Sequence, residues 1–285
     1  MSKVVEQSIL SVLIIGTAFF FNGHGGGLPF ESLPLVLGAY LAGKSVLGLG
    51  LFAAAQIQLR RVLGRGWTTA SFSTLPSERE LLRFAFSSNL SATAILIFRE
   101  SELLWVGFFL NREAAGLYKN AYTIVSFLSV PADPLILAVY PELNRLIVQQ
   151  AWPRLRAFLG SVTLLAFAYN ALLATGLIIF GRWVLAIYGQ PYVAAYPAMI
   201  TLLAGLAFNY TLFWNRPLLL SFGLPTFPLW ATLMAGVLKV SLAFPLVPRY
   251  GYGMEAVLLS VYYVVSVGLI VWRGMVELRK REQAA

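Results

Sequence analysis

The sequence contains no cysteine and only one histidine among its 285 residues. Without cysteine the chain can form no disulfide framework, no thiolate metal site and no cysteine nucleophile. The histidine, His24, precedes three consecutive glycines in a polar stretch, where a single imidazole does not make a metal site. We therefore expect neither a bound metal nor a cofactor.

Charged residues are also scarce. They make up 12% of the chain, whereas 59% of the residues are hydrophobic and the mean hydropathy is +0.75. The longest polar stretch, Arg60 to Glu80, has too few apolar residues to bury a core, which excludes a separate soluble domain. Apolar runs of about twenty residues suit membrane helices rather than the short alternating strands of a barrel. The sequence predicts an all-α polytopic membrane protein.

About eight apolar segments are candidates for transmembrane helices. They cover residues 8–22, 33–59, 81–110, 114–139, 155–180, 193–222, 225–247 and 254–273. Most of the 21 Lys and Arg residues lie on the side of these spans that holds both termini, whereas Arg112, Arg182 and Arg249 lie on the other. Because basic flanks stay inside, we expect a multi-pass protein of the cytoplasmic membrane with both termini in the cytoplasm.

The net charge of +9 is explained by this topology and does not indicate a nucleic-acid partner. Membrane lipids are the expected contact of the basic C-terminal residues, because anionic headgroups attract Lys and Arg beside a membrane. Within the fourth span, Pro131 and Pro134 flank Asp133. Proline breaks the helical hydrogen-bond ladder, so Val130 to Pro134 is predicted to form a kink.

Arg99, Glu100 and Glu102 stand inside the third apolar span, where charges mark a pathway, a coupling site or a structural ion pair. The third and fourth spans form a predicted antiparallel hairpin that turns near Asn111, so distance from the turn gives depth. At ~1.5 Å per residue, Glu102 and Lys119 both lie roughly 10 to 14 Å below the turn, near enough in height to pair.

Lys44 and Lys239 also fall within apolar spans. Two interpretations of the intramembrane charges stay open. They neutralise one another where helices pack, or they line a hydrated cavity that binds a phosphorylated headgroup, with Glu100 or Glu102 carrying a proton or cation. The candidate binding or coupling residues are Arg99, Glu100, Glu102, Lys119, Lys44 and Lys239.

Several short motifs occur in an order and at a spacing that resemble those of a known family of transporters. They are residues 81–86 (LLRFAF), 115–118 (AGLY) with Ala121-Tyr122, 140–146 (YPELNRL), 188–192 (YGQPY) with 195–197 (AYP), 221–223 (SFG) and 246–253 (LVPRYGYG). In these features the chain resembles the C-terminal two thirds of a Wzx-type polysaccharide or lipid-linked oligosaccharide flippase. That family belongs to the superfamily that also contains the MATE exporters and the lipid II flippase.

The resemblance implies two six-helix lobes that rock about a central cavity and expose it alternately to each face. Residues 81–274 would form the six-helix C-terminal lobe, 1–60 the last two helices of a truncated N-terminal lobe, 61–80 a cytoplasmic linker and 275–285 a basic cytoplasmic tail. The implied cargo is polyprenyl-pyrophosphate-linked oligosaccharide for cell-surface polysaccharide synthesis, with coupling to H⁺ or Na⁺. About four family helices are absent from the sequence. A truncated reading frame, a fragment, or a chain completed by a partner or a second copy are the alternatives that this leaves.

Two other functions remain as alternatives. A MATE-like exporter of small molecules would share the fold and would need a carboxylate-rich cavity for cationic substrates. A membrane glycosyltransferase or ligase would need catalytic groups at a face, and the sequence has neither a large external loop nor a nucleophile constellation. The expected activity is therefore transport rather than enzymatic catalysis.

Overall fold

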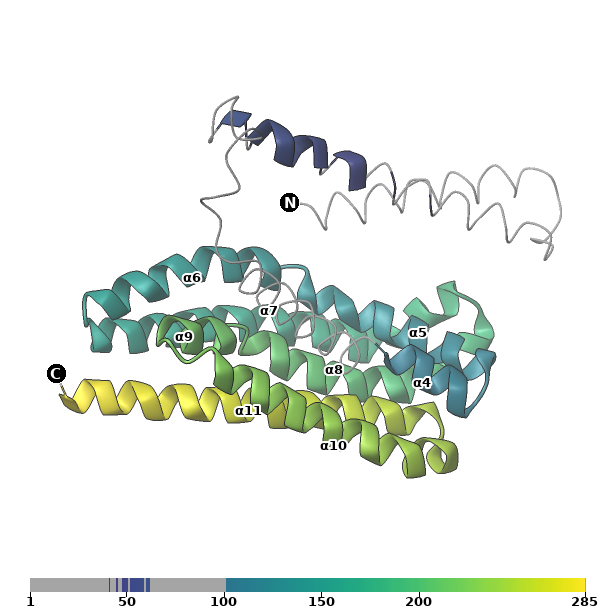
Figure 1. The fold of residues 1–285 in the computed structure, drawn as a ribbon. Helices are drawn as coiled ribbons and strands as arrows, with labels where there is room; N and C mark the ends of the chain where they lie inside the picture. The colour runs from purple at the N-terminus through teal and green to yellow at the C-terminus, as the bar shows by residue number, and fades with distance from the viewer. Residues whose placement is uncertain are drawn as a thin grey trace, which may run out of the picture. The chain divides into compact units, whose positions relative to one another are not determined.

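A computed structural model describes residues 101–284, apart from the side chains of Asp133 and Ala284. It also describes residues 41, 45, 48–50, 52–58, 60 and 61. The chain divides into two units, Met1–Glu78 and Arg79–Ala285. The described residues of the first unit are helical. The second unit holds the packed helices that are labelled in Figure 1.

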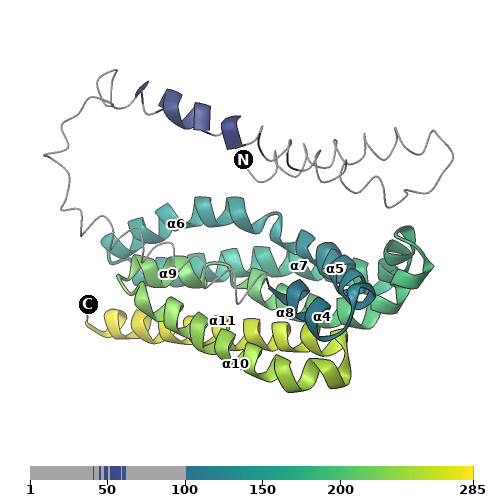
Figure 2. The same ribbon diagram turned by 45° about the vertical axis from the view of Figure 1, so that its right-hand side comes forward.

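The described part of the second unit is built from helices and turns, without strands. Its helices are α4 (Glu102–Phe109), α5 (Arg112–Ser126), α6 (Ala132–Val148), α7 (Trp152–Ile187), α8 (Tyr196–Thr211), α9 (Asn215–Ser221), α10 (Thr226–Tyr250) and α11 (Tyr252–Ala284), with short 3₁₀ turns at Phe127–Ser129 and Gln190–Ala195. The helices α7, α8, α10 and α11 run roughly along one direction in both ribbon views (Figures 1 and 2).

Four stretches of this unit are long and apolar enough to cross a membrane. They are Trp152–Ile187, Gln190–Ser221, Thr226–Tyr250 and Tyr252–Gln283. They confirm the apolar spans predicted at 155–180, 193–222, 225–247 and 254–273 as helical. The second stretch is broken into a 3₁₀ turn, α8 and α9. The predicted spans before residue 101 lie largely outside the described residues, so eight transmembrane helices fit the structure only loosely.

The predicted kink after α5 is confirmed. The segments Arg112–Ser129 and Pro134–Val148 are bent by 41° at the break between them. A proline inside a helix removes a backbone donor and clashes with the preceding turn, which accounts for a break beside Pro131 and Pro134. The two segments together are long enough to make one bent span.

The helices α8 and α11 approach each other closely at Gly205. Gly205 of α8 faces Ser260 of α11 so closely that a Cβ atom on Gly205 would lie 2.5 Å from the Ser260 Cα. The Ser260 hydroxyl donates a hydrogen bond of 2.7 Å to the carbonyl of Thr201. Small residues and such interhelical hydrogen bonds are the usual means of helix association in membranes.

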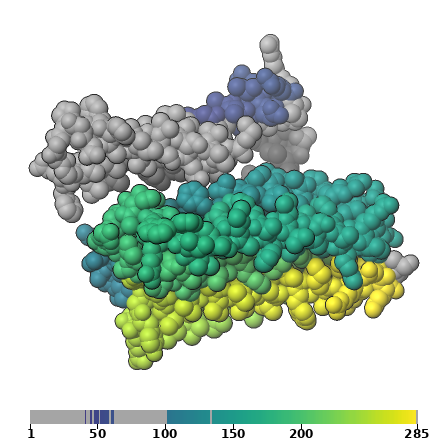
Figure 3. Space-filling model, turned by 180° about the vertical axis from the view of Figure 1, so that it is seen from behind, coloured from purple at the N-terminus to yellow at the C-terminus, as the bar shows by residue number. Residues whose placement is uncertain are grey.

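The outer surface of α7 is strongly apolar. Its exposed large side chains are Leu164, Leu165, Phe167, Leu172, Ile178, Ile179, Phe180, Trp183 and Ile187. Figure 3 shows the molecule from behind, where the teal and green surface of the middle helices lies against the yellow surface of α11. An apolar surface of this extent is expected of a helix that contacts lipid rather than water.

The contact between α8 and α11 yields a stability prediction. Gly205→Val places side-chain atoms where the Ser260 backbone lies, and overpacking of this kind costs typically about 1–3 kcal/mol. Thermal unfolding of the purified chain in detergent should show a lower midpoint for Gly205→Val. The matched control is Gly176→Val on α7, where an added Cβ meets nothing within 4 Å. Equal midpoints for the two variants would contradict the close approach.

Candidate functional site

Three charged side chains from three helices meet inside the second unit. The Lys239 ammonium of α10 lies 2.8 Å from the Glu102 carboxylate of α4 and 3.0 Å from the Glu255 carboxylate of α11. Lys239 and Glu102 are each 3% exposed, and Glu255 is fully buried. We call these three residues the buried cluster. A single ammonium group therefore joins α4, α10 and α11.

The local sequence favours each member of the cluster at its position. Glu102 and Glu255 both stand in the first turn of their helices, where the partial positive charge of the helix N-terminus stabilises a carboxylate. Lys239 follows Ala235 and Gly236 and precedes Ala243 on the buried side of α10. Small residues on that side let neighbouring helices come close, so the long Lys239 side chain can reach both carboxylates.

The charges of the buried cluster do not balance. Lys239 Nζ donates a hydrogen bond to Glu102 Oε1. Glu255 Oε1 lies at ion-pair distance from the same ammonium, but neither Glu255 oxygen accepts a hydrogen bond within the described residues. Burial of an ion costs several kcal/mol unless it is paired. With all three groups ionised the cluster has one excess negative charge, which a proton or a monovalent cation would neutralise.

A buried phenol interacts electrostatically with the two carboxylates. Tyr118 of α5 is 2% exposed, and its hydroxyl has no hydrogen-bond partner among the described residues. The phenol is close enough to Glu102 and Glu255 to interact electrostatically with both. Its ring stacks on Tyr122, with centroids 6.5 Å apart. Because a buried tyrosine hydroxyl normally finds an acceptor, the site combines an unused donor with the underbonded carboxylate of Glu255.

The structure brings Glu102 and Lys239 together, but it does not pair Glu102 with Lys119. The predicted Glu102–Lys119 ion pair is wrong, because Glu102 binds Lys239 and the Lys119 side chain is exposed. Depth below a hairpin turn does not determine which way a side chain points. On α5 the buried face carries Tyr118, and the next residue is turned about 100° away from it.

The other sequence-based candidates lie outside the described residues. These are Arg99, Glu100 and Lys44. Sequence analysis missed Glu255, although it is the only acidic residue in the predicted span 254–273. Its position beside the turn at Gly251 is typical of an interfacial residue, so its burial depends on tertiary packing that a span boundary does not show.

The unequal charges predict unequal effects of single substitutions on stability. Lys239→Met removes the one counter-charge that the described residues offer to two buried carboxylates, and it is expected to lower the free energy of unfolding by about 3–5 kcal/mol. Glu255→Gln and Glu102→Gln each leave Lys239 paired with one carboxylate, and glutamine has nearly the same shape as glutamate. Each of these two substitutions should therefore lower the free energy of unfolding far less. Unfolding in detergent, followed by circular dichroism, measures the difference.

The control for this series is an exposed pair on α6. Arg145 donates to the Glu142 carboxylate one helical turn away, and both side chains face solvent. Arg145→Met should change stability little, because exposed ion pairs contribute little. A Lys239→Met variant as stable as Arg145→Met would contradict the buried cluster.

Comparisons with known proteins identified no relative of this chain. No protein-family profile, no curated protein and no solved structure matches the chain. The fold and the candidate site therefore stand on the helices and contacts described above.

Proposed function

We propose that this chain is a membrane transporter of the MATE-like type that flips lipid-linked oligosaccharide, with the buried cluster as its coupling site for H⁺ or Na⁺. The observation that carries the proposal is the unbalanced group of Glu102, Lys239 and Glu255 in the interior of apolar helices. Ionisable residues inside membrane helices are rare and usually serve ion pathways or proton relays. The motifs that resemble the flippases support the type of transporter, and the cargo is the one that this resemblance implies.

Coupling requires that cation binding change the contacts between helices. Lys239 is shared by two carboxylates, so neutralising Glu255 weakens its attraction to α10 and leaves Lys239 with Glu102 alone. A ligand shifts a conformational equilibrium only by its different affinity for the two states. In this proposal the cation binds the state in which Glu255 and Lys239 are separated. The Tyr118 hydroxyl then supplies the hydrogen bond that the freed carboxylate lacks.

The cargo headgroup needs a separate set of contacts. A pyrophosphate cannot cross hydrocarbon without compensating polar groups, and cationic side chains are the usual partners of phosphate. Lys239 is already held by two carboxylates, so its proposed role moves from cargo binding to coupling. Arg99, Lys44 and Lys119 remain the proposed contacts of the headgroup. A second copy or a partner chain would supply the other lobe.

One observation favours a second candidate function. The buried cluster has one carboxylate in excess, which would attract a positively charged substrate. A MATE-like exporter of small molecules would need such a carboxylate in its cavity. The two functions differ in cargo rather than in fold. Transport of an organic cation, without movement of a pyrophosphate-linked sugar, would select the exporter.

The test is transbilayer movement of a fluorescent polyprenyl-pyrophosphate oligosaccharide in proteoliposomes that contain the full chain. We expect movement to respond to an imposed pH or Na⁺ gradient in the unmodified chain. Glu255→Gln should remove this response, because the variant cannot gain and lose the coupling cation. The matched control, Glu142→Gln, changes an exposed carboxylate on α6 and should retain the response.

Two results would contradict the proposal. The first is gradient-driven movement that persists unchanged in Glu102→Gln and Glu255→Gln. The second is the absence of any movement from folded chain in the presence of a completing lobe, which would exclude this cargo.

A further inference from the structure

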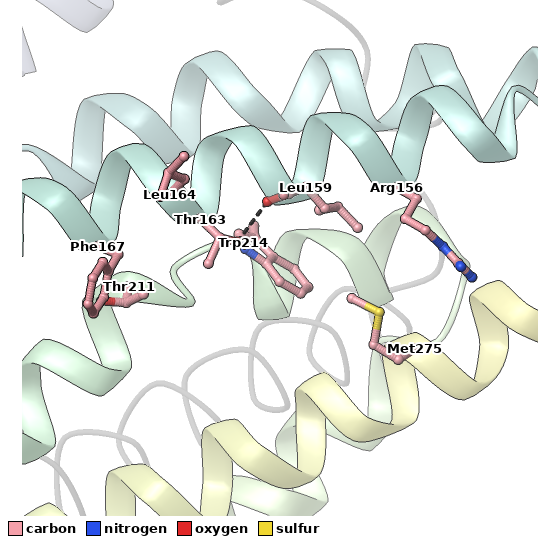
Figure 4. Close-up of a pocket in the computed structure, with 9 residues that line it drawn as sticks. Arg156, Leu159, Thr163, Leu164, Phe167, Thr211, Trp214 and Met275 are labelled. Carbon is pink, nitrogen blue, oxygen red and sulfur yellow. Dashed lines mark hydrogen bonds between the residues drawn. The ribbon is translucent and has the colours of Figure 1, made fainter.

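An open groove of about 480 Å³ runs along one side of α7, between this helix, the junction of α8 with α9, and α11. Figure 4 shows Arg156 at one end, Phe167 and Thr211 at the other, and Trp214 and Met275 between them. Gly160 of α7 also lines the groove. The groove is separate from the buried cluster, because no residue of the cluster lines it.

The length of the groove matches one leaflet of a bilayer. From Arg156 to Phe167 the helix rises about 16 Å, at ~1.5 Å per residue. Half of a typical hydrocarbon core is about 15 Å. A ligand that fills the groove along its length therefore has the dimension of a lipid acyl chain.

The wall of the groove requires no polar ligand. Trp214 donates a 2.7 Å hydrogen bond from its indole to the Thr163 hydroxyl, drawn in Figure 4. That hydroxyl donates in turn to the carbonyl of Leu159, also at 2.7 Å. The Thr211 hydroxyl accepts a hydrogen bond from Asn170. With the polar atoms of these side chains already bonded, the remaining lining is hydrocarbon and aromatic.

The charged end of the groove is basic. The Arg156 side chain is 58% exposed and uses one guanidinium nitrogen to bind Glu282 of α11 at 2.7 Å. A guanidinium carries five N–H donors, so most of them remain for another acceptor. Arg279 is exposed and lies on the same stripe of α11 as Met275 and Glu282, at helical spacings of four and three residues. Two arginines against one glutamate leave a net positive charge there.

We propose that the groove is a binding site for an anionic phospholipid, whose phosphate contacts Arg156 and Arg279 and whose acyl chain lies along α7 as far as Phe167. Arginine binds phosphate oxygens through paired N–H donors, and the apolar wall accepts the chain. The positive end distinguishes this lipid from zwitterionic neighbours. Lipid binding in this groove is independent of the proposed transport function, so it can be tested separately.

Filling the groove tests the position of the acyl chain. An added Cβ at Gly160 meets nothing within 4 Å, so Gly160→Phe can fold normally while its ring occupies the groove. The control is Gly176→Phe on the same helix, where a Cβ also meets nothing and no groove is lined. Native mass spectrometry of the full chain in mixed micelles of phosphatidylglycerol and phosphatidylcholine counts the retained lipid.

We expect Gly160→Phe to reduce retention of phosphatidylglycerol by about tenfold or more, the factor for about 1.4 kcal/mol. Gly176→Phe should match the unmodified chain. Equal retention in the two variants would overturn the proposed position of the chain.

Removing the basic end tests the choice of headgroup. Arg156→Gln should lower the preference for phosphatidylglycerol over phosphatidylcholine by about fivefold, the factor expected for one basic residue at a membrane surface. Arg154→Gln removes the same charge from an exposed position on the same helix that does not line the groove, and should leave the preference nearly intact. Equal effects of the two variants, or a lack of preference in the unmodified chain, would show that the groove selects no anionic lipid.

Discussion

The interaction on which the second unit depends is the ammonium of Lys239 held between the carboxylates of Glu102 and Glu255. A charge in a low-dielectric interior must be paired, and among the described residues each of these three groups has its counter-charge in another helix of the group. This requirement determines how α4, α10 and α11 come together. It also leaves one carboxylate more than the single ammonium can neutralise.

The remaining contacts of the unit support this arrangement. Gly205 lets α8 approach the backbone of α11, and the Ser260 hydroxyl closes the contact with a hydrogen bond. These interactions involve neutral groups and small residues, so they hold the helices together whatever the charge state of the cluster. A frame of neutral contacts around an unbalanced ionic site fits the proposed transport function, because a cation can then alter one set of contacts while the rest persist.

Apolar length and proline position predicted much of the fold. The spans at 155–180, 225–247 and 254–273 fall on long helices, the span at 193–222 falls on the broken stretch of α8 and α9, and the bend beside Pro131 and Pro134 was expected from the lost backbone donors. Such signals are local, so they are readable without knowing the packing. The break between α8 and α9 was not predicted, although Asn209, Thr211, Asn215 and Arg216 interrupt the apolar sequence around Leu212 and Pro217 follows them.

The candidate site was harder to predict because its pairing is not local. Glu102 and Lys239 were both recognised as intramembrane charges, but they are 137 residues apart in the chain. Hairpin depth suggested Lys119 as the partner, but the Lys119 side chain is exposed, whereas Glu102 is buried. Glu255 was hidden by its place at a span boundary. Depth follows from helical rise, whereas the direction of a side chain depends on how the helices pack.

The most direct test of the buried cluster is a double-mutant cycle between Glu102 and Lys239. The free energy of unfolding would be measured for the unmodified chain, Glu102→Gln, Lys239→Met and the double variant. A buried pair predicts a coupling energy of about 2 kcal/mol or more, because the loss of Lys239 matters less once Glu102 is neutral. Effects that add to within about 0.5 kcal/mol would contradict the account, since independent sites behave in that way.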